Sequence, residues 1–296
     1  MTEWQAWPSY RRLSAVARAP VTGAAATGSL VAESLADLIE SIGKYAPEAF
    51  PEAIREIAGE LLDRQAAIAP IVAIVNTVFL NERSDPQDLA REVRSVGERM
   101  AMSASVLSRV GAALVTGGSS VLTVGGSGSV RDLLILAGDS RSFSVVCAAT
   151  MPFGEGLELA ADLAAAGLMV EVIPDDQVID TVPGVDLVVV GAAALGPHAA
   201  MNAVGTLEIA ERASVFGVPV YLVASIEKAL PEALFRRAVE AGAAAGQFEP
   251  IPLALATAVV TEMGILESRA AGQLAAERRV APALLRRLSG GPGSPR

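Results

Sequence analysis

The sequence predicts an α/β protein with a helical N-terminal domain and a Rossmann-like, doubly wound parallel-sheet C-terminal domain. Residues 11–115 place apolar residues at three- and four-residue spacing with charges between them, and contain no convincing strand. After residue 118, short apolar runs rich in β-branched residues alternate with helical segments. Near-continuous apolar strands joined by helices are typical of a parallel sheet that is covered on both faces.

The helical domain is expected to span residues 1–115. Its helical pattern runs through 28–45, 47–80 and 85–115. Pro51, Pro70 and Pro86 stand where helices would begin or break, and "SDP" before Gln87 is a typical helix start, with a capping side chain and proline in the first turn.

The C-terminal domain is expected to span residues 116–285 and to hold the ligand. We expect strands over 120–124, 142–149, 168–174, 185–193 and 219–225, an ambiguous apolar run over 250–260, and helices over 130–139, 154–167 and 201–217. In such sheets ligands bind beyond the carboxyl ends of the strands. The glycine- and proline-rich ending, 286–296, is expected to be a disordered tail.

Composition excludes several classes of function. The net charge is -10 and no block of lysine or arginine exists, which argues against nucleic acid as a partner. The single cysteine excludes an internal disulfide and favours a cytoplasmic protein. Two uncharged windows, 110–130 and 187–207, are interrupted by glycine, serine or proline, so we expect buried strands and turns, not a membrane partner.

A glycine-rich turn follows the first predicted strand, in "SSVLTVGGSGSVRDLL" at 119–134. Amides at a helix N-terminus carry partial positive charge, and glycine lets an anion approach closely. A dinucleotide fingerprint is incomplete, because Arg131 replaces its third glycine and no acidic residue ends the next strand. The turn therefore predicts a phosphate-type anion site, or else glycines that serve only its backbone angles.

Four further stretches resemble one known family. They are "VTGAAATGSLVA" at 21–32, "TMPFGEGLELAADLAAAGLMVEVIPD" at 150–175, "VDLVVVGAAALGPHAAMNAVGTLEIAERASVFGVPVYLVAS" at 185–225 and "PIPLALATAVVTEMGIL" at 250–266. Together with the glycine turn, they are similar to the superfamily of initiation factor 2B alpha, beta and delta subunits, methylthioribose-1-phosphate isomerase and ribose-1,5-bisphosphate isomerase.

The resemblance implies a helical domain before a Rossmann-like domain, often dimeric through the latter. It also implies, for the isomerases, opening of a sugar 1-phosphate and movement of a proton between C1 and C2. A cysteine in the first glycine turn and the aspartate of a "GAD" motif would carry this chemistry, because one group must move a proton while another handles the neighbouring oxygen.

This sequence departs from that pattern at the chemically active positions. The cysteine position falls at Gly125 and the aspartate position at Ala193. Family arginines are replaced by Thr22 and Met151, and a family lysine by Ala203. Neither glycine nor alanine can carry a proton, so the family's isomerase mechanism cannot operate here as written.

The rest of the implied ligand site is retained. Its members are Gly23, Ala24, Ala25, Gly125, Gly126, Ser127, Gly128, Ser129, Thr150, Glu155, Asn202, Gly205, Thr206 and Lys228. Asn202 and Thr206 also fit a simple helix cap, and Lys228 also fits a solvated lysine.

Few residues could replace the missing chemistry. His198 and Glu155 are weak candidates for a substitute acid or base, although an exposed loop also explains His198. Cys147 lies inside an apolar strand and is expected to be buried and inert. No spacing of histidine, cysteine and carboxylates suggests a metal site, and we expect no cofactor.

The sequence therefore favours an initiation factor 2B-like, non-catalytic binder of a sugar phosphate or nucleotide that works through self-association or a protein partner. A diverged isomerase or lyase and a pure scaffold are the alternatives. We expect the pocket between the two halves, lined by 23–25 and 125–129, and a homodimer in which "GAAALGPHAAMNAVG" at 191–205 lies near the interface.

Overall fold

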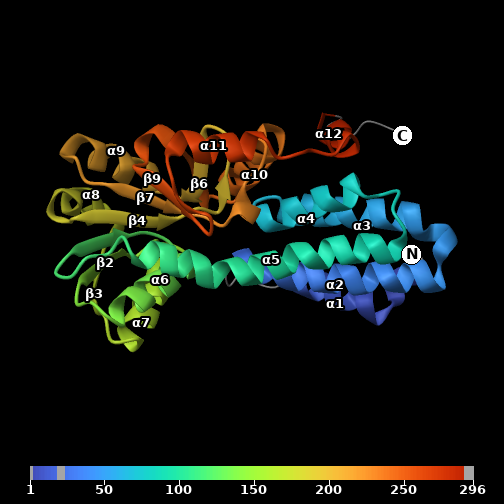
Figure 1. Cartoon of the computed structure of the whole chain (residues 1–296), viewed down its shortest axis with the longest axis horizontal. Coiled ribbons are helices and arrows are strands. Elements are labelled where there is room, and N and C mark those ends of the chain that lie inside the picture. Colours follow the sequence, from blue (N-terminus) through green and yellow to red (C-terminus); the bar gives the residue numbers. More distant parts are fainter. Residues whose placement is uncertain (1–2, 19–23, 290–296) are drawn as a thin grey trace.

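Two halves of different architecture lie along the long axis of the molecule, a bundle of helices and a sheet covered by helices (Figure 1). The computed structural model describes residues 3–18 and 24–289. Within these residues no helix is long and apolar enough to span a membrane.

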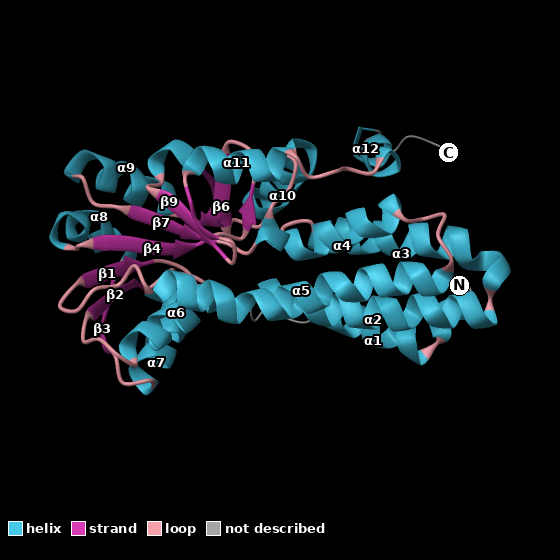
Figure 2. Ribbon diagram, in the orientation of Figure 1, coloured by secondary structure: helices cyan, strands magenta, loops and turns pink. Residues whose placement is uncertain are grey.

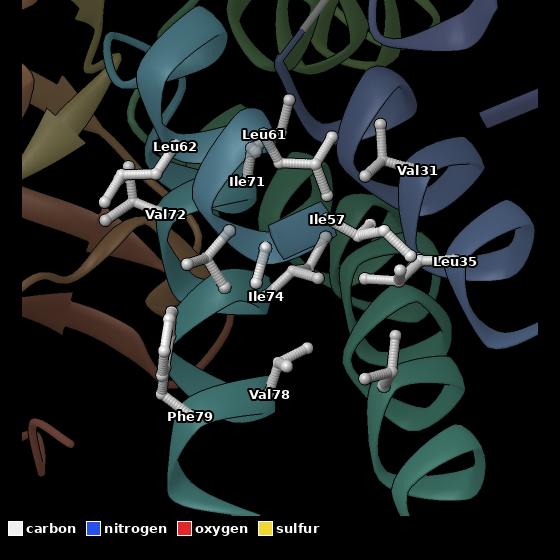
Figure 3. Close-up of a cluster of buried hydrophobic side chains, with 14 of the residues drawn as sticks. Val31, Leu35, Ile57, Leu61, Leu62, Ile71, Val72, Ile74, Val78 and Phe79 are labelled. Carbon is white, nitrogen blue, oxygen red and sulfur yellow. The ribbon is translucent and has the colours of Figure 1, made fainter. Parts of the chain in front are cut away.

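The bundle is built from five α-helices and two short 3-10 helices. They are η1 (Glu3–Ala6), α1 (Pro8–Val16), α2 (Ala24–Tyr45), η2 (Pro47–Ala49), α3 (Phe50–Gln65), α4 (Ala69–Leu80) and α5 (Pro86–Ala112). As predicted, proline stands in the first turn of α3, α4 and α5, and the Asp85 side chain accepts a hydrogen bond from the Gln87 amide at 2.9 Å. Figure 3 shows the apolar side chains of α2, α3 and α4, such as Leu35, Ile57 and Ile74, packed together in the bundle core.

Helix α5 belongs to both halves. It packs along α2 and then against α6 (Gly128–Gly138). Two glycines allow these close approaches: a Cβ on Gly97 would lie 2.8 Å from the Ala32 Cβ, and one on Gly111 would lie 2.8 Å from Leu133 Cδ2.

The second half contains a mostly parallel seven-stranded sheet, which confirms the predicted parallel sheet and its five expected strands and adds β9 and the antiparallel β10. Its strand order is β10-β9-β7-β4-β1-β2-β3, parallel except for β10. The bounds are β1 (Ser120–Thr123), β2 (Ser144–Ala148), β3 (Met169–Ile173), β4 (Leu187–Gly191), β7 (Val220–Val223), β9 (Ala258–Thr261) and β10 (Gly264–Leu266). The chain moves from β1 to one edge and then, from β4, to the other edge, so the topological switch point lies between β1 and β4.

Helices cover both faces of this sheet (Figure 2). The end of α5, α6 and α7 (Glu155–Ala165) pack on one face, while α8 (Val178–Thr181), α9 (Thr206–Phe216) and α11 (Ser268–Ala276) pack on the other. This two-sided burial confirms the predicted Rossmann-like, doubly wound architecture.

A small antiparallel sheet was not predicted. It has the order β5-β6-β8, with β5 at Ala194–Leu195, β6 at Ala199–Ala203 and β8 at Phe248–Pro252. The helix predicted over 201–217 is therefore wrong at its start, because β6 pairs with β5 and β8 and α9 begins only at Thr206. The ambiguous run 250–260 divides into the end of β8, η6 (Leu253–Leu255) and the start of β9.

The C-terminal segment returns to the bundle. Residues 282–289 form α12 (Pro282–Ser289), so the tail predicted from 286 is wrong up to Ser289, and 290–296 lie outside the described residues. The reason is long-range: Leu284 is fully buried in the bundle core, and Asn76 of α4 donates to the Arg279 carbonyl at 2.8 Å and accepts from the Ala281 amide at 2.9 Å.

Replacing Asn76 with leucine should weaken the attachment of the C-terminal segment to the bundle. Asn76→Leu leaves the Arg279 carbonyl and the Ala281 amide without their partner, so we expect the free energy of unfolding to fall by about 1–3 kcal/mol. Urea denaturation measures the loss, and hydrogen exchange should show faster exchange in 279–289. Thr77→Ala is the control, because that hydroxyl bonds only within α4, to the Ala73 carbonyl. Equal stability of the two variants would contradict the role given to Asn76.

Candidate functional site

The candidate site lies at the switch point, where the loops after β1 and β4 separate. The loop after β1 is the glycine turn, and the loop after β4 contains Ala192 and Ala193. In a doubly wound sheet this crevice is where ligands bind, so topology alone selects the same turn that the sequence selects.

The glycine turn presents four amides that no described residue accepts. Gly125 has a φ of +81°, a conformation that favours glycine, and its amide donates to the Thr150 hydroxyl at 3.1 Å. The Ser127 hydroxyl caps α6 by accepting from the Val130 amide at 3.4 Å. In the described part of the chain, the amides from Gly126 to Ser129 have no hydrogen-bond partner. Four amides at the start of an eleven-residue helix form an electropositive cradle of the kind that binds anions.

Several predicted site residues surround this turn. A Cβ on Gly126 would lie 3.0 Å from the Glu155 Cβ, and one on Gly125 would lie 3.2 Å from the Ala203 Cβ. Gly191, at the end of β4, lies directly against the Ser127 side chain. The structure thus brings the loops after β1, β2, β4 and β6 to one place.

The loop after β2 is held by a residue that the sequence did not single out. Both oxygens of the Asp175 carboxylate accept amide hydrogen bonds, from Thr150 at 2.7 Å and from Met151 at 2.8 Å. Thr150 has a φ of +57°, which these bonds and its contact with Gly125 stabilise. The available signal was a carboxylate just after β3, at the carboxyl edge of the sheet.

Asn202 and Thr206 form a local turn before α9. The Asn202 amide donates to the Thr206 hydroxyl at 3.1 Å, and that hydroxyl donates to the Ala203 carbonyl at 2.6 Å. Both side chains are buried, and Gly205, with a φ of +97°, precedes the helix. Neither side chain caps α9, because its N-cap is Gly205 and no side chain bonds there as a cap, so the helix-cap explanation is wrong. The Asn202 side chain lies near Gly191.

Lys228 is buried, so the prediction of a solvated lysine is wrong. It ends η5 (Ile226–Lys228), is 6% exposed and donates from Nζ to the Ala192 carbonyl at 2.8 Å. Burial lowers the pKa of Lys228 to about 8, against the opposing effect of the Glu262 carboxylate. An amine at the carboxyl end of β4 thus adjoins the switch point.

Other predicted residues are placed differently. Gly23 lies outside the described residues, while Ala24 and Ala25 are the half-buried first residues of α2. The start of α2 lies at the sheet-facing end of the bundle, because Gly28 packs against Met100 of α5 and Pro70 of α4.

His198 is not brought to the glycine turn. It is exposed in the turn between β5 and β6, four residues from Asn202, or about 13 Å along an extended strand. Cys147 is buried in β2, and burial raises the pKa of its thiol to about 12, as expected of an inert cysteine. Among residues 3–18 and 24–289 no cluster of His, Cys, Asp and Glu has the geometry of a metal site.

A separate cleft of about 730 Å³ lies between α3, α4 and α12. Its walls carry four arginines and four glutamates, several of which, such as Arg55 and Glu82, are already paired. It is at the far end of the bundle from the glycine turn (Figure 1) and shares no residue with the candidate site.

The fold and the site define a class of protein: a helical bundle joined to a doubly wound sheet, with an anion cradle at its switch point. The family model for the initiation factor 2 subunit family matches residues 20–249. The chain belongs to this family, as its sequence motifs predict.

Curated relatives include both factors and enzymes. The chain is 30% identical over 148 residues to translation initiation factor eIF2B subunit alpha of Dictyostelium discoideum, a match to 49% of this chain and 46% of that protein. It thus matches about half the length of that relative. It is 25% identical to ribose 1,5-bisphosphate isomerase of Methanocaldococcus jannaschii, over 74% of this chain and 73% of the relative. It is 31% identical to methylthioribose-1-phosphate isomerase of Xylella fastidiosa, over 64% and 63%.

Solved structures share the fold. The translation initiation factor eIF-2B structure from Pyrococcus horikoshii has a TM-score of 0.72 at 20% identity, covering 90% of this chain and 98% of that one. A chain of the tetrameric eIF2B-beta2-delta2 complex from C. thermophilum has a TM-score of 0.70 at 17% identity, over 91% and 93%.

The buried amine predicts a pH-dependent stability. The folded-state pKa of Lys228 is about 8, below the ordinary 10.5, so the unfolded chain binds more protons between these values and stability should rise with pH there. Below pH 8 the charged, buried amine costs about 3 kcal/mol. We therefore expect the stability difference between Lys228→Met and the native chain to change by about that amount from pH 7.5 to 10.5, in favour of the native chain.

Urea denaturation at several pH values measures this difference. Lys44→Met is the matched control, because Lys44 is the only other lysine in the chain. Parallel pH profiles for native protein and Lys228→Met would show that the amine titrates normally.

Proposed function

We propose that this chain is a cytoplasmic, non-catalytic, initiation factor 2B-like protein that binds a small phosphorylated ligand at residues 125–129. The ligand class is a sugar phosphate or a nucleoside monophosphate, bound by a domain spanning 116–285 that follows a helical domain at 1–115. The observation that carries the proposal is the set of four amides at the start of α6, at the switch point of the sheet, that have no partner among residues 3–18 and 24–289.

The absence of catalysis is argued from the residues beside the cradle. Proton transfer between adjacent carbons needs a pair of groups, and the two positions that the family resemblance assigns to them are Gly125 and Ala193. Glu155 lies against Gly126 and is a single carboxylate. The Lys228 amine is already bonded to the Ala192 carbonyl.

Weak binding is expected from the same geometry. Arg131 of α6 pairs with Asp132 at 2.9 Å and with Asp162 at 3.3 Å, so its charge is already compensated by two carboxylates. Apart from the Lys228 amine at the end of β4, the groups that would face a phosphate are neutral amides and hydroxyls, which give weaker hydrogen bonds than guanidinium groups do.

A second candidate keeps catalysis. Because Glu155 is beside the cradle, a diverged isomerase or lyase would use it as acid or base. This alternative requires turnover that depends on Glu155, which distinguishes it from the binder.

Calorimetry with ribose 5-phosphate, adenosine monophosphate and inorganic phosphate tests the cradle. We expect weak binding of at least one phosphorylated ligand, and its loss in Gly126→Val, because the added side chain meets Glu155 and covers the amides. Gly184→Val is the matched control, since a Cβ there meets nothing within 4 Å. Thermal unfolding checks that both variants fold.

Three results would contradict this proposal. Turnover of ribose 1,5-bisphosphate or methylthioribose 1-phosphate at an enzyme-like rate, lost in Glu155→Gln, would establish the enzyme instead. Binding that survives in Gly126→Val would place the ligand elsewhere, and no binding of any ligand would favour a scaffold.

We also propose that the chain assembles as a homodimer through its C-terminal half. The stretch 191–205 that prompted this expectation is mostly buried within one chain, so it is not itself the contact surface. Exposed apolar side chains on the loop after β2 and on β3, including Phe153 and Met169, offer a surface instead. Light scattering at micromolar concentration should give twice the chain mass of 30.3 kDa, and a monomer would refute the proposal.

A further inference from the structure

The short helix η5 carries a buried carboxylate that joins the two halves of the molecule. The side chain of Glu227 is 9% exposed. Its Oε1 accepts from Nε of Arg99 on α5 at 2.7 Å, and its Oε2 accepts from Nη2 of Arg278, just beyond α11, at 3.2 Å. Arg278 also donates to the Ile226 carbonyl at 2.7 Å.

Other hydrogen bonds fix the three residues of η5, 226–228. The Ile226 amide donates to both oxygens of Glu262, at 3.1 and 3.0 Å, and Lys228 reaches the Ala192 carbonyl at the end of β4. The charged groups around Lys228 are thus Glu227 on its own turn, Glu262 after β9, Arg99 on α5 and Arg278 after α11. Helix α4, which also packs on η5, has no ionisable side chain.

We infer that Arg99, Glu227 and Arg278 form a positioning triad that holds Lys228 at the carboxyl end of β4 and makes the candidate site depend on how the helical bundle is seated. The inference rests on the proposed function for the statement that a ligand binds at this site. The triad itself is defined by the hydrogen bonds given above. Arg99 comes from the bundle and Arg278 from the segment that returns to it, so any shift of the bundle pulls on the turn that ends in Lys228.

The triad differs from the other ion pairs of α5. Arg94 pairs with Asp37 and Glu40, both on α2, so that pair lies within the bundle. The Arg99 pair crosses between the halves and ends on a buried carboxylate. Removing one partner of a buried pair leaves an uncompensated charge, and here that charge lies one residue from Lys228.

The chain offers a direct readout, because it contains only two lysines, Lys44 and Lys228. In protein labelled with carbon-13 lysine, NMR can follow both amines through a pH titration, with Lys44 as the internal reference. Arg99→Ala removes a positive charge and should raise the pKa of Lys228 by roughly half a pH unit. Glu227→Gln removes a negative charge and should lower it.

Opposite shifts distinguish a positioning triad from general loosening, which would move both variants toward the ordinary pKa of lysine. Arg99→Lys keeps the positive charge and should restore the native titration of Lys228, with its added third lysine signal assigned by comparison with the native spectrum. Arg94→Ala should leave the titration of Lys228 unchanged. If Glu227→Gln does not fold, the comparison of Arg99→Ala with Arg99→Lys still tests whether Arg99 controls the titration of Lys228. An unchanged Lys228 titration in Arg99→Ala would overturn the inference.

Binding of ribose 5-phosphate, measured on the same variants, separates this inference from the proposed function. We expect several-fold weaker binding in Arg99→Ala than in Arg94→Ala. If Lys228 shifts as stated but the native chain binds no phosphorylated ligand, the triad stands and the proposed function fails. If the native chain binds and Arg99→Ala binds equally, the inference fails and the proposed function stands.

Discussion

The continuity of α5 is the constraint on which the junction of the two halves depends. Its 27 residues form one helix about 40 Å long, which packs along α2 from its first turn to about its middle and on α6 at its end. A single rigid helix fixes the direction of the bundle relative to the sheet. The positions of Arg99 beside η5 and of the start of α2 near the sheet both follow from that direction.

Periodicity predicted most of the fold, because the long helices and the buried parallel strands each carry a strong local pattern. It failed at 199–203, where the local propensity of Ala-Ala-Met-Asn-Ala favours a helix but the chain forms a strand. Pairing with β8, about fifty residues further along the chain, decides the conformation there. Likewise, α12 folds where the composition indicates a tail, because Asn76 is more than two hundred residues away in sequence.

The residues of the candidate site divide in the same way, into those with local geometry and those held by partners distant in the sequence. The glycine turn, its capping serine and the neighbouring Glu155 were predictable, since their geometry is local or follows from sheet topology. The burial of Lys228 and the bonds of Glu227 were not, because Arg99 lies 128 residues from Glu227 in sequence. A charged residue after a strand looks solvated until its distant partners are known.

The turn after β1 and the loop after β2 differ in whether their backbone amides have an acceptor in the chain. Backbone amides of the loop after β2 bind a carboxylate from the chain itself, since Asp175 accepts from Thr150 and Met151. The turn after β1 has a comparable set of amides with no internal acceptor among the described residues, and the two loops touch through Gly125 and Thr150. The amides of the loop after β2 are therefore satisfied within the fold, whereas those of the turn after β1 keep the geometry that the proposed anion site uses. Under the function proposed above, a phosphorylated ligand would supply such an acceptor, and hydrogen bonds from backbone amides would not depend on the side chains that stand at Gly125 and Ala193.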